Sequence, residues 1–107
     1  MKLCIRDRHI VDLHKRPTAA YEWYGETVGF TRLSAAVAAQ LADRTDLFVR
    51  QRRCNVEYEE AIRDLIIEAP LGTFGYVETG GLPWTEIDFT EDVARARDVI
   101  FPLLAEG

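Results

Sequence analysis

The chain has 107 residues, 48% of them hydrophobic, which suits one domain with one core and argues against two domains. No run approaches the roughly 18 apolar residues of a membrane span, and the charged start MKLCIRDR is unlike a signal peptide, so we expect a cytosolic protein without a membrane partner. Residues 1–54 carry ten bases and six acids, whereas residues 55–107 carry three bases and twelve acids, and this acidic second half argues against nucleic-acid binding.

The first half of the chain begins with two short runs of apolar residues, at 2–7 and 9–14, separated by the polar pair Asp7-Arg8. This pattern predicts a β-hairpin, which ends before Pro17. A linker rich in aromatic residues follows at 18–24. Alternation of apolar and small residues then predicts a strand over 25–33.

The middle of the chain has the periodicity of two helices. Ser34 is a good N-cap for a helix that we expect to run to residue 53, and a second helix is expected over 55–68. Pro70 and Gly72 close the second helix, and a further strand is predicted over 73–78.

The last part of the chain, GLPWTEIDFTEDVARA, predicts a strand over 84–89 followed by a helix over 91–100, which Pro102 would end or kink. The strand period sends Trp84, Glu86 and Asp88 to one face. Thr90 can cap the helix, whose first turn is acidic. A carboxylate at a strand end is a common way to hold Mg²⁺ against a phosphate, although a solvated acid that ends a strand gives the same pattern.

Interleaved strands and helices predict an α/β layered domain. No glycine-rich phosphate loop of the form GxGxxG or GxxxxGK[ST] occurs, so any nucleotide site in this chain is expected to be incomplete. Cys4 and Cys54 lack the paired spacing of a zinc site and are expected to be free thiols.

Four motifs occur in series: IVDLHKRP at 10–17, YGETVGFTRLS at 24–34, YEEAIRDLI at 58–66 and PWTEIDFTEDVARA at 83–96. In this order and spacing the chain resembles the carboxyl-terminal half of sugar-phosphate-type nucleotidyltransferases in the MobA-like NTP transferase family. The branch that it resembles is that of the phosphocholine and aminoalkylphosphonate cytidylyltransferases, and the resemblance covers nearly the whole chain.

The resemblance implies the C-terminal portion of a Rossmann-like nucleotidyltransferase fold, an α/β mixed sheet with flanking helices. It implies that residues 1–107 form one partial domain, the acceptor-binding half. The implied activity joins a nucleoside triphosphate, with CTP favoured, to a small phosphorylated acceptor and releases pyrophosphate with Mg²⁺. Asp88 would be one of two aspartates that hold the metal, Lys15 would meet the acceptor phosphate, and Glu26 could approach the acceptor.

The family's amino-terminal half, which carries the glycine-rich loop and the other metal-binding aspartate, has no counterpart in this sequence. We therefore expect the chain to be inactive alone, as a fragment, a truncated product or one subunit of a split enzyme that needs the missing half in cis or in trans. The alternative is a non-catalytic, self-associating interaction module. Either interpretation predicts a homo-oligomer, because a half-domain exposes sheet edge and apolar surface.

Aromatic residues are the remaining candidates for acceptor binding. Trp23, Tyr58 and Trp84, with Tyr21 and Tyr24, could form a cage around an ammonium group, with nearby glutamates as counter-charge. Packing of the same rings in a core or an interface is the alternative. Lys15 likewise has the alternative of an ordinary surface lysine.

Overall fold

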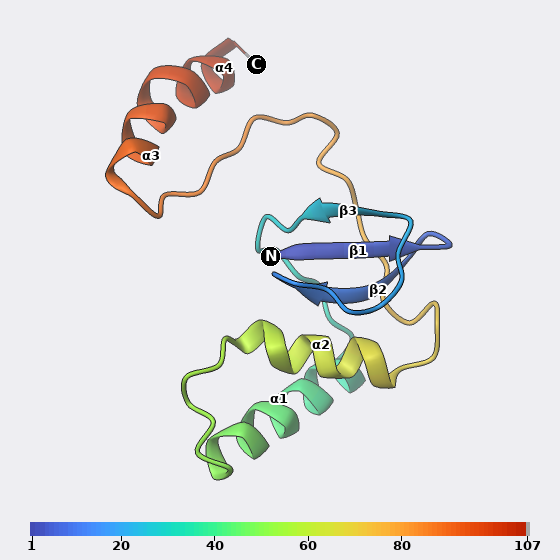
Figure 1. Ribbon diagram of the computed structural model, residues 1–107. Helices are drawn as coiled ribbons and strands as arrows, with labels where there is room; N and C mark the ends of the chain where they lie inside the picture. Colours follow the sequence, from blue (N-terminus) through green and yellow to red (C-terminus); the bar gives the residue numbers. More distant parts are fainter. Residues whose placement is uncertain (107) are drawn as a thin grey trace. The chain divides into compact units, whose positions relative to one another are not determined.

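The computed structural model describes residues 1–106 as a mixed α/β chain (Figure 1). It divides into two compact units, one of Met1–Tyr76 and a second from Val77 on. The first unit holds a three-stranded sheet and two long helices, and the second holds an extended segment and a helical run. The elements are β1 (Lys2–Arg6), β2 (His9–His14), β3 (Trp23–Glu26), α1 (Ala35–Arg50), α2 (Tyr58–Glu68), α3 (Thr90–Arg95), η1 (Ala96–Ile100) and α4 (Phe101–Glu106).

The predicted hairpin is confirmed, since β1 and β2 pair antiparallel from Lys2 opposite His14 to Arg6 opposite His9. Asp7 and Arg8 form the two-residue turn, and both have positive φ, at 49° and 65°. Two consecutive positive φ angles give a turn whose twist matches that of the strands. A bulge beside Cys4 and Ile5 shifts the register, so that β2 has one residue more than β1 there.

The third strand lies earlier than predicted. β3 pairs antiparallel with the other edge of β1, with Leu3 opposite Gly25, so the sheet order is β2-β1-β3. The predicted strand over 25–33 is wrong beyond Glu26, because residues 27–33 have no strand partner among the described residues. Gly29 has φ of 85°, which extended strands do not use.

Both predicted long helices are confirmed, with shorter ends. Ser34 caps α1, since its Oγ accepts a hydrogen bond of 3.2 Å from the Val37 N–H. α1 ends at Arg50 because Arg52 adopts φ of 59° and the Arg53 N–H bonds back to the Phe48 carbonyl at 2.8 Å. This pattern is a Schellman motif, with an arginine where glycine is usual.

The core of the first unit lies between the sheet and α2. Leu13 of β2 packs with Ile62 and Ile66 of α2, and Leu3 and Leu41 contact the same cluster. In Figure 1, α2 lies between the sheet and α1, so the unit has three layers. The fold is α/β as expected, but the expected mixed sheet is wrong: all three strands are antiparallel, whereas a Rossmann-like sheet is mostly parallel.

The two predicted later strands are also wrong. Within 73–78 the chain makes one ladder-like bond, from the Ile10 N–H to the Phe74 carbonyl at 3.0 Å, and no strand results. Residues 84–89 of the second unit form no strand with any described segment. Alternating side chains favour extended backbone, but a strand also needs a neighbour for its N–H and C=O groups.

The helical run of the second unit begins where predicted and continues past Pro102. Its N-cap is Phe89, one residue before the predicted Thr90. The central part is a π-turn, η1, in which the Phe101 N–H bonds to the Ala96 carbonyl. Because proline has no N–H and its ring crowds the preceding turn, a wider turn just before Pro102 lets the helix continue. None of the helices in the described chain is long and apolar enough to span a membrane.

Candidate functional site

The most constrained polar side chain of the first unit is Asp12 in β2, whose carboxylate has no exposed surface. Its Oδ1 accepts hydrogen bonds from the Leu13 N–H at 2.8 Å and from Arg63 Nε at 2.8 Å. Its Oδ2 accepts from the N–H groups of Thr18 at 2.9 Å and Ala19 at 3.2 Å. Four donors therefore satisfy one buried carboxylate, as a buried charge requires.

The pKa of Asp12 reflects two opposed effects. Burial alone would raise the pKa of this carboxyl, but the bonds from Arg63 and from the Ala19 and Thr18 amides outweigh burial and hold the pKa below its ordinary value. Asp12 is therefore ionised at neutral pH despite its burial.

Arg63 of α2 connects Asp12 to the loop that follows β2. Besides its bond to Asp12, the guanidinium donates from Nη2 to Thr18 Oγ1 at 3.0 Å. Only 18% of the Arg63 side chain is exposed. A planar guanidinium can make both bonds at once in a fixed geometry, so the helix, the strand and the loop are held in one network.

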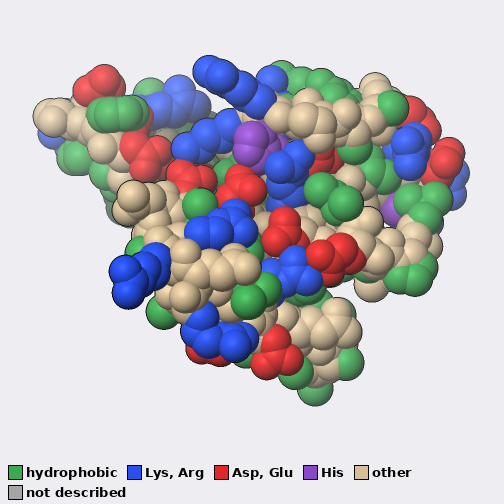
Figure 2. Space-filling view, turned by 60° about the horizontal axis from the view of Figure 1, so that its bottom comes forward, with side chains coloured by type: hydrophobic (Ala, Val, Ile, Leu, Met, Phe, Trp, Pro, Cys, Tyr) green, Lys and Arg blue, Asp and Glu red, His purple; other side chains and the backbone are tan. Residues whose placement is uncertain are grey.

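Two further ion pairs join the end of β2 to the same helix. His14 Nε2 lies 3.1 Å from Glu60 Oε1, and Lys15 Nζ lies 2.8 Å from Glu57 Oε1. In these three pairs the partners at α2 are Glu57, Glu60 and Arg63. They are spaced three residues apart, so they share one face of α2, which begins just after Glu57. We call these six residues the β2–α2 ion-pair cluster: Asp12, His14, Lys15, Glu57, Glu60 and Arg63. Figure 2 shows basic and acidic side chains interspersed over the face that carries α1 and α2.

His14 is held at both ring nitrogens. Nδ1 lies 2.9 Å from both the N–H and the carbonyl oxygen of Arg16, so it accepts from the first or donates to the second according to the tautomer. Nε2 lies 3.1 Å from Glu60 Oε1. These contacts orient the start of the loop.

Lys15, the residue expected to meet an acceptor phosphate, is exposed and paired. Its ammonium and the Glu57 carboxylate are 67% and 50% exposed, and each stabilises the other's charge. The hydrogen bond from Lys15 lowers the pKa of Glu57, and the bond to Glu57 raises the pKa of Lys15. Ion pairs this exposed are weak, so another anion can displace Glu57.

The other expected substrate residues of the first unit lie apart from one another. Glu26, at the end of β3, accepts a bond of 3.0 Å from the amino group of Met1. Tyr58, the first residue of α2, is 58% exposed. Trp23 packs edge-on against Tyr76, with ring centroids 5.4 Å apart.

The aromatic rings near β3 form two groups rather than one cage. Trp23 lies opposite Ile5 and Tyr24 opposite Cys4, so the strand period places the two rings on opposite sheet faces. Tyr24 contacts Tyr21 at 6.2 Å and carries the Lys2 ammonium over its face at 4.7 Å. The Tyr24 face thus binds a cation of this chain, as a cage ring would.

Asp88 and Trp84 belong to the second unit, and both are exposed. The Asp88 and Phe89 N–H groups each donate a 2.9 Å bond to Asp92 Oδ2. These two bonds lower the pKa of Asp92 and make it the capping carboxylate of the helical run. The backbone at Asp88 is therefore fixed to the helix start, while its own carboxylate faces solvent.

Within residues 1–106, no three His, Cys, Asp or Glu side chains are grouped so as to share a metal ion. Mg²⁺ commonly binds through one or two carboxylates and completes its shell with water and phosphate oxygens. An exposed carboxylate such as Asp88 fits that role as a single ligand.

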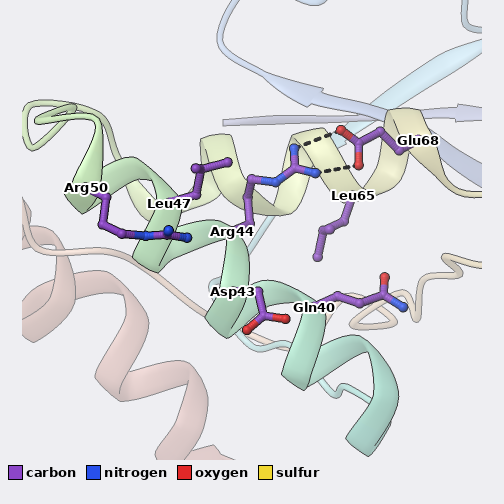
Figure 3. Close-up of a pocket in the computed structure, with 7 residues that line it drawn as sticks. All are labelled: Gln40, Asp43, Arg44, Leu47, Arg50, Leu65 and Glu68. Atoms are coloured by element: carbon purple, nitrogen blue, oxygen red, sulfur yellow. Dashed lines mark hydrogen bonds and ion pairs between the residues drawn. The ribbon is translucent and has the colours of Figure 1, made fainter.

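A groove of about 370 Å³ lies between α1 and α2 (Figure 3). Arg44 crosses it and binds Glu68 through two parallel bonds of 2.8 and 2.6 Å. Arg44 also donates to Asp64 at 2.9 Å. Carboxylates of α2 therefore bind both terminal nitrogens of the Arg44 guanidinium. Arg44 in this groove joins the two helices, so the groove is not an anion site. Its lining residues are Gln40, Asp43, Arg44, Leu47, Arg50, Leu65 and Glu68.

Sequence reasoning missed the role of Asp12. Its position inside the strand HIVDLH was the available signal, because a carboxylate between apolar strand residues needs donors nearby. Comparison of the chain with protein-family models, with curated proteins and with solved structures found no match. The resemblance to nucleotidyltransferases therefore stays a prediction.

Proposed function

We propose that this chain is the acceptor-binding half of a Mg²⁺-dependent nucleotidyltransferase of Rossmann-like ancestry. The favoured donor is CTP, and the acceptor is a small phosphorylated or phosphonylated alcohol or amine. An acceptor oxygen attacks the α-phosphorus of the nucleotide, the bond from that phosphorus to the bridging oxygen breaks, and pyrophosphate leaves. The glycine-rich loop and second aspartate belong to a nucleotide-binding half.

One observation carries the proposal: an exposed Asp88 carboxylate ends an extended segment whose backbone is tied to a helix start. The segment has no strand partner within residues 1–106. A sheet in a nucleotide-binding half would supply that partner, since an unpaired extended segment adds readily to a sheet edge. This arrangement supports Asp88 as a metal ligand.

The remaining expected residues serve the acceptor in this proposal. Lys15 binds the acceptor phosphate after releasing Glu57, and Glu26 approaches the acceptor. When bound, Mg²⁺ neutralises the phosphate charge that opposes attack. The chemistry needs little beyond positioning and charge neutralisation, which the carboxylate of Asp88 and the ammonium of Lys15, once released by Glu57, can support.

The test uses the chain completed with a nucleotide-binding half, in cis or in trans, and measures pyrophosphate release. Asp88→Asn should abolish Mg²⁺-dependent turnover, because the amide has no charge for the metal. Glu86→Gln is the matched control, since Glu86 is an exposed acid two residues away in the same segment. Full activity of Asp88→Asn would remove the metal assignment.

A self-associating interaction module is the second candidate, and the apolar surface of the second unit favours it. Its exposed apolar side chains include Leu82, Ile87, Phe89, Phe101, Leu103 and Leu104. Such side chains call for a partner, and a second copy is the simplest one. Calorimetric titration of the chain with a small phosphate monoester separates the candidates: heat of binding supports the acceptor-binding half, whereas no heat supports the module.

A further inference from the structure

The loop that follows β2 is anchored from inside the protein. We call residues 15–19 the Lys15 loop. Its far end is fixed because the Thr18 and Ala19 N–H groups both donate to the buried Asp12 carboxylate. Its near end is fixed because the Arg16 N–H donates to the His14 ring. Pro17, with its restricted φ, stiffens the middle.

Lys15 presents its charged side chain at the start of this loop, held by one exposed ion pair. It lies three residues from Asp12 and three from Thr18, so both flanks of its backbone are fixed. Its ammonium, by contrast, is 67% exposed and touches a carboxylate that is itself half exposed. A fixed backbone that presents an exposed ammonium favours phosphate binding, because less conformational freedom is lost when the ligand binds.

The buried Asp12–Arg63 ion pair also orders the loop, in addition to any contribution that it makes to the stability of the fold. Burying two charges requires that their attraction and bonds repay the loss of hydration, and an apolar pair of similar volume is often at least as stable. The pair here makes bonds that an apolar pair could not, to two loop amides and to Thr18 Oγ1. Those bonds determine where the Lys15 loop lies.

We propose that Asp12 is a positioning residue for a phosphate monoester: through the Thr18 and Ala19 amides and through Arg63, it holds the Lys15 loop so that Lys15 can exchange Glu57 for the phosphate. This inference rests on the proposed function and adds to it the residue that places Lys15. Asp12 itself is buried and does not touch the ligand.

The experiment titrates the full chain with inorganic phosphate at constant ionic strength set with chloride, and follows by NMR the backbone amide resonances of residues 15, 16, 18 and 19, which every variant retains. Wild type should bind, and Lys15→Gln should lose the response. Asp12→Asn should bind about tenfold more weakly, because its amide keeps the shape but not the charge. Adding Asp12→Asn to Lys15→Gln should cause no further loss, because Asp12 acts on the ligand only through Lys15.

A stability control separates positioning from folding. Ile66→Val removes one methylene from the core of the same unit and touches no residue of the Lys15 loop. It should lower the unfolding midpoint and leave phosphate affinity unchanged. Amide exchange at Thr18 and Ala19 should accelerate in Asp12→Asn and not in Ile66→Val.

Each outcome decides between the two proposals. If wild type does not bind phosphate, the assignment of Lys15 fails, and the positioning role fails with it. If wild type binds and Asp12→Asn binds equally well, the positioning role alone is wrong. Equal weakening by Ile66→Val and Asp12→Asn would also overturn it, because loss of stability would then explain the change.

Discussion

The two units use similar apolar residues in different ways. From Met1 to Tyr76, eight apolar side chains are buried, and they come from β1, β2, α1 and α2. From Val77 on, Ile100 is the one buried side chain in the described chain, although leucine, phenylalanine and valine are frequent. A sheet and a helix can cover each other's apolar faces, whereas a single helical run has no second layer. Burial therefore depends on the partner rather than on composition.

The largest expected effect tests this contrast with one truncation in each unit. Leu13→Ala should lower the free energy of unfolding by about 2–5 kcal/mol, because it leaves a cavity between β2 and α2. Ile87→Ala should change it by less than about 0.5 kcal/mol, because Ile87 is 61% exposed. Urea unfolding followed by circular dichroism measures both. Equal effects would show that Ile87 is buried in solution, in a dimer for example.

Acid should act on the first unit through Asp12. The pKa of Asp12 is below its ordinary value in the folded chain, so its contribution to stability is fully present above about pH 4, near the unfolded pKa. It is lost as the pH falls through the folded pKa. The free energy of unfolding should thus fall below pH 4 more steeply in wild type than in Asp12→Asn. Parallel pH profiles of the two proteins would contradict the ionised, paired state of Asp12.

The bonds from Arg44 that join α1 to α2 should contribute less to the free energy of unfolding. Arg44→Gln removes the bonds to Glu68 and Asp64 and should lower the free energy of unfolding by less than about 1 kcal/mol, with a smaller loss at high salt. Arg50→Gln is the control, since Arg50 pairs with Asp46 of its own helix, and both are 67% exposed. An equal change in the two variants would mean that Arg44 does not join α1 to α2.

The smallest effect is expected in the second unit. Asp92→Ala removes the acceptor of the Asp88 and Phe89 amides, so these two amides should exchange several-fold faster. The pKa of Asp92 is lowered, so in wild type the cap persists above the ordinary aspartate pKa and is lost as the pH falls through the lowered value. Glu91→Ala is the control, because Glu91 lies in the same turn. Unchanged exchange in Asp92→Ala would mean that the helix start needs no cap.

The helices of the first unit were predictable because their determinants are local. Ser34 bonds a residue three positions away, and the apolar stripe of α2 recurs within one helix. The hairpin was predictable for the same reason, since its turn residues are adjacent. β3 was placed too late because its strand character comes from pairing with β1, about twenty residues earlier in the chain.

Alternation of residues along the chain predicted strands wrongly where the backbone has no neighbouring strand to pair with. Residues 73–78 and 84–89 alternate as strands do, yet neither has a ladder in the described chain. In the candidate site, too, local features were predictable and contacts between distant residues were not. Lys15 and Asp88 could be proposed from residue type and sequence position alone, whereas the network around Asp12 depends on Arg63, fifty-one residues away. Single-sequence patterns carry no information on that contact.

The way in which Asp12 holds its loop has a consequence for how this segment tolerates change. Thr18 and Ala19 are recognised by their main-chain amides, which every residue except proline possesses. Their side chains are therefore nearly free to vary in a mutational scan, apart from the Thr18 hydroxyl that Arg63 contacts. Proline at either position would remove one of the two amide donors to Asp12 Oδ2. Such a scan of the loop should give a profile in which one amino acid is forbidden and the others are nearly equivalent.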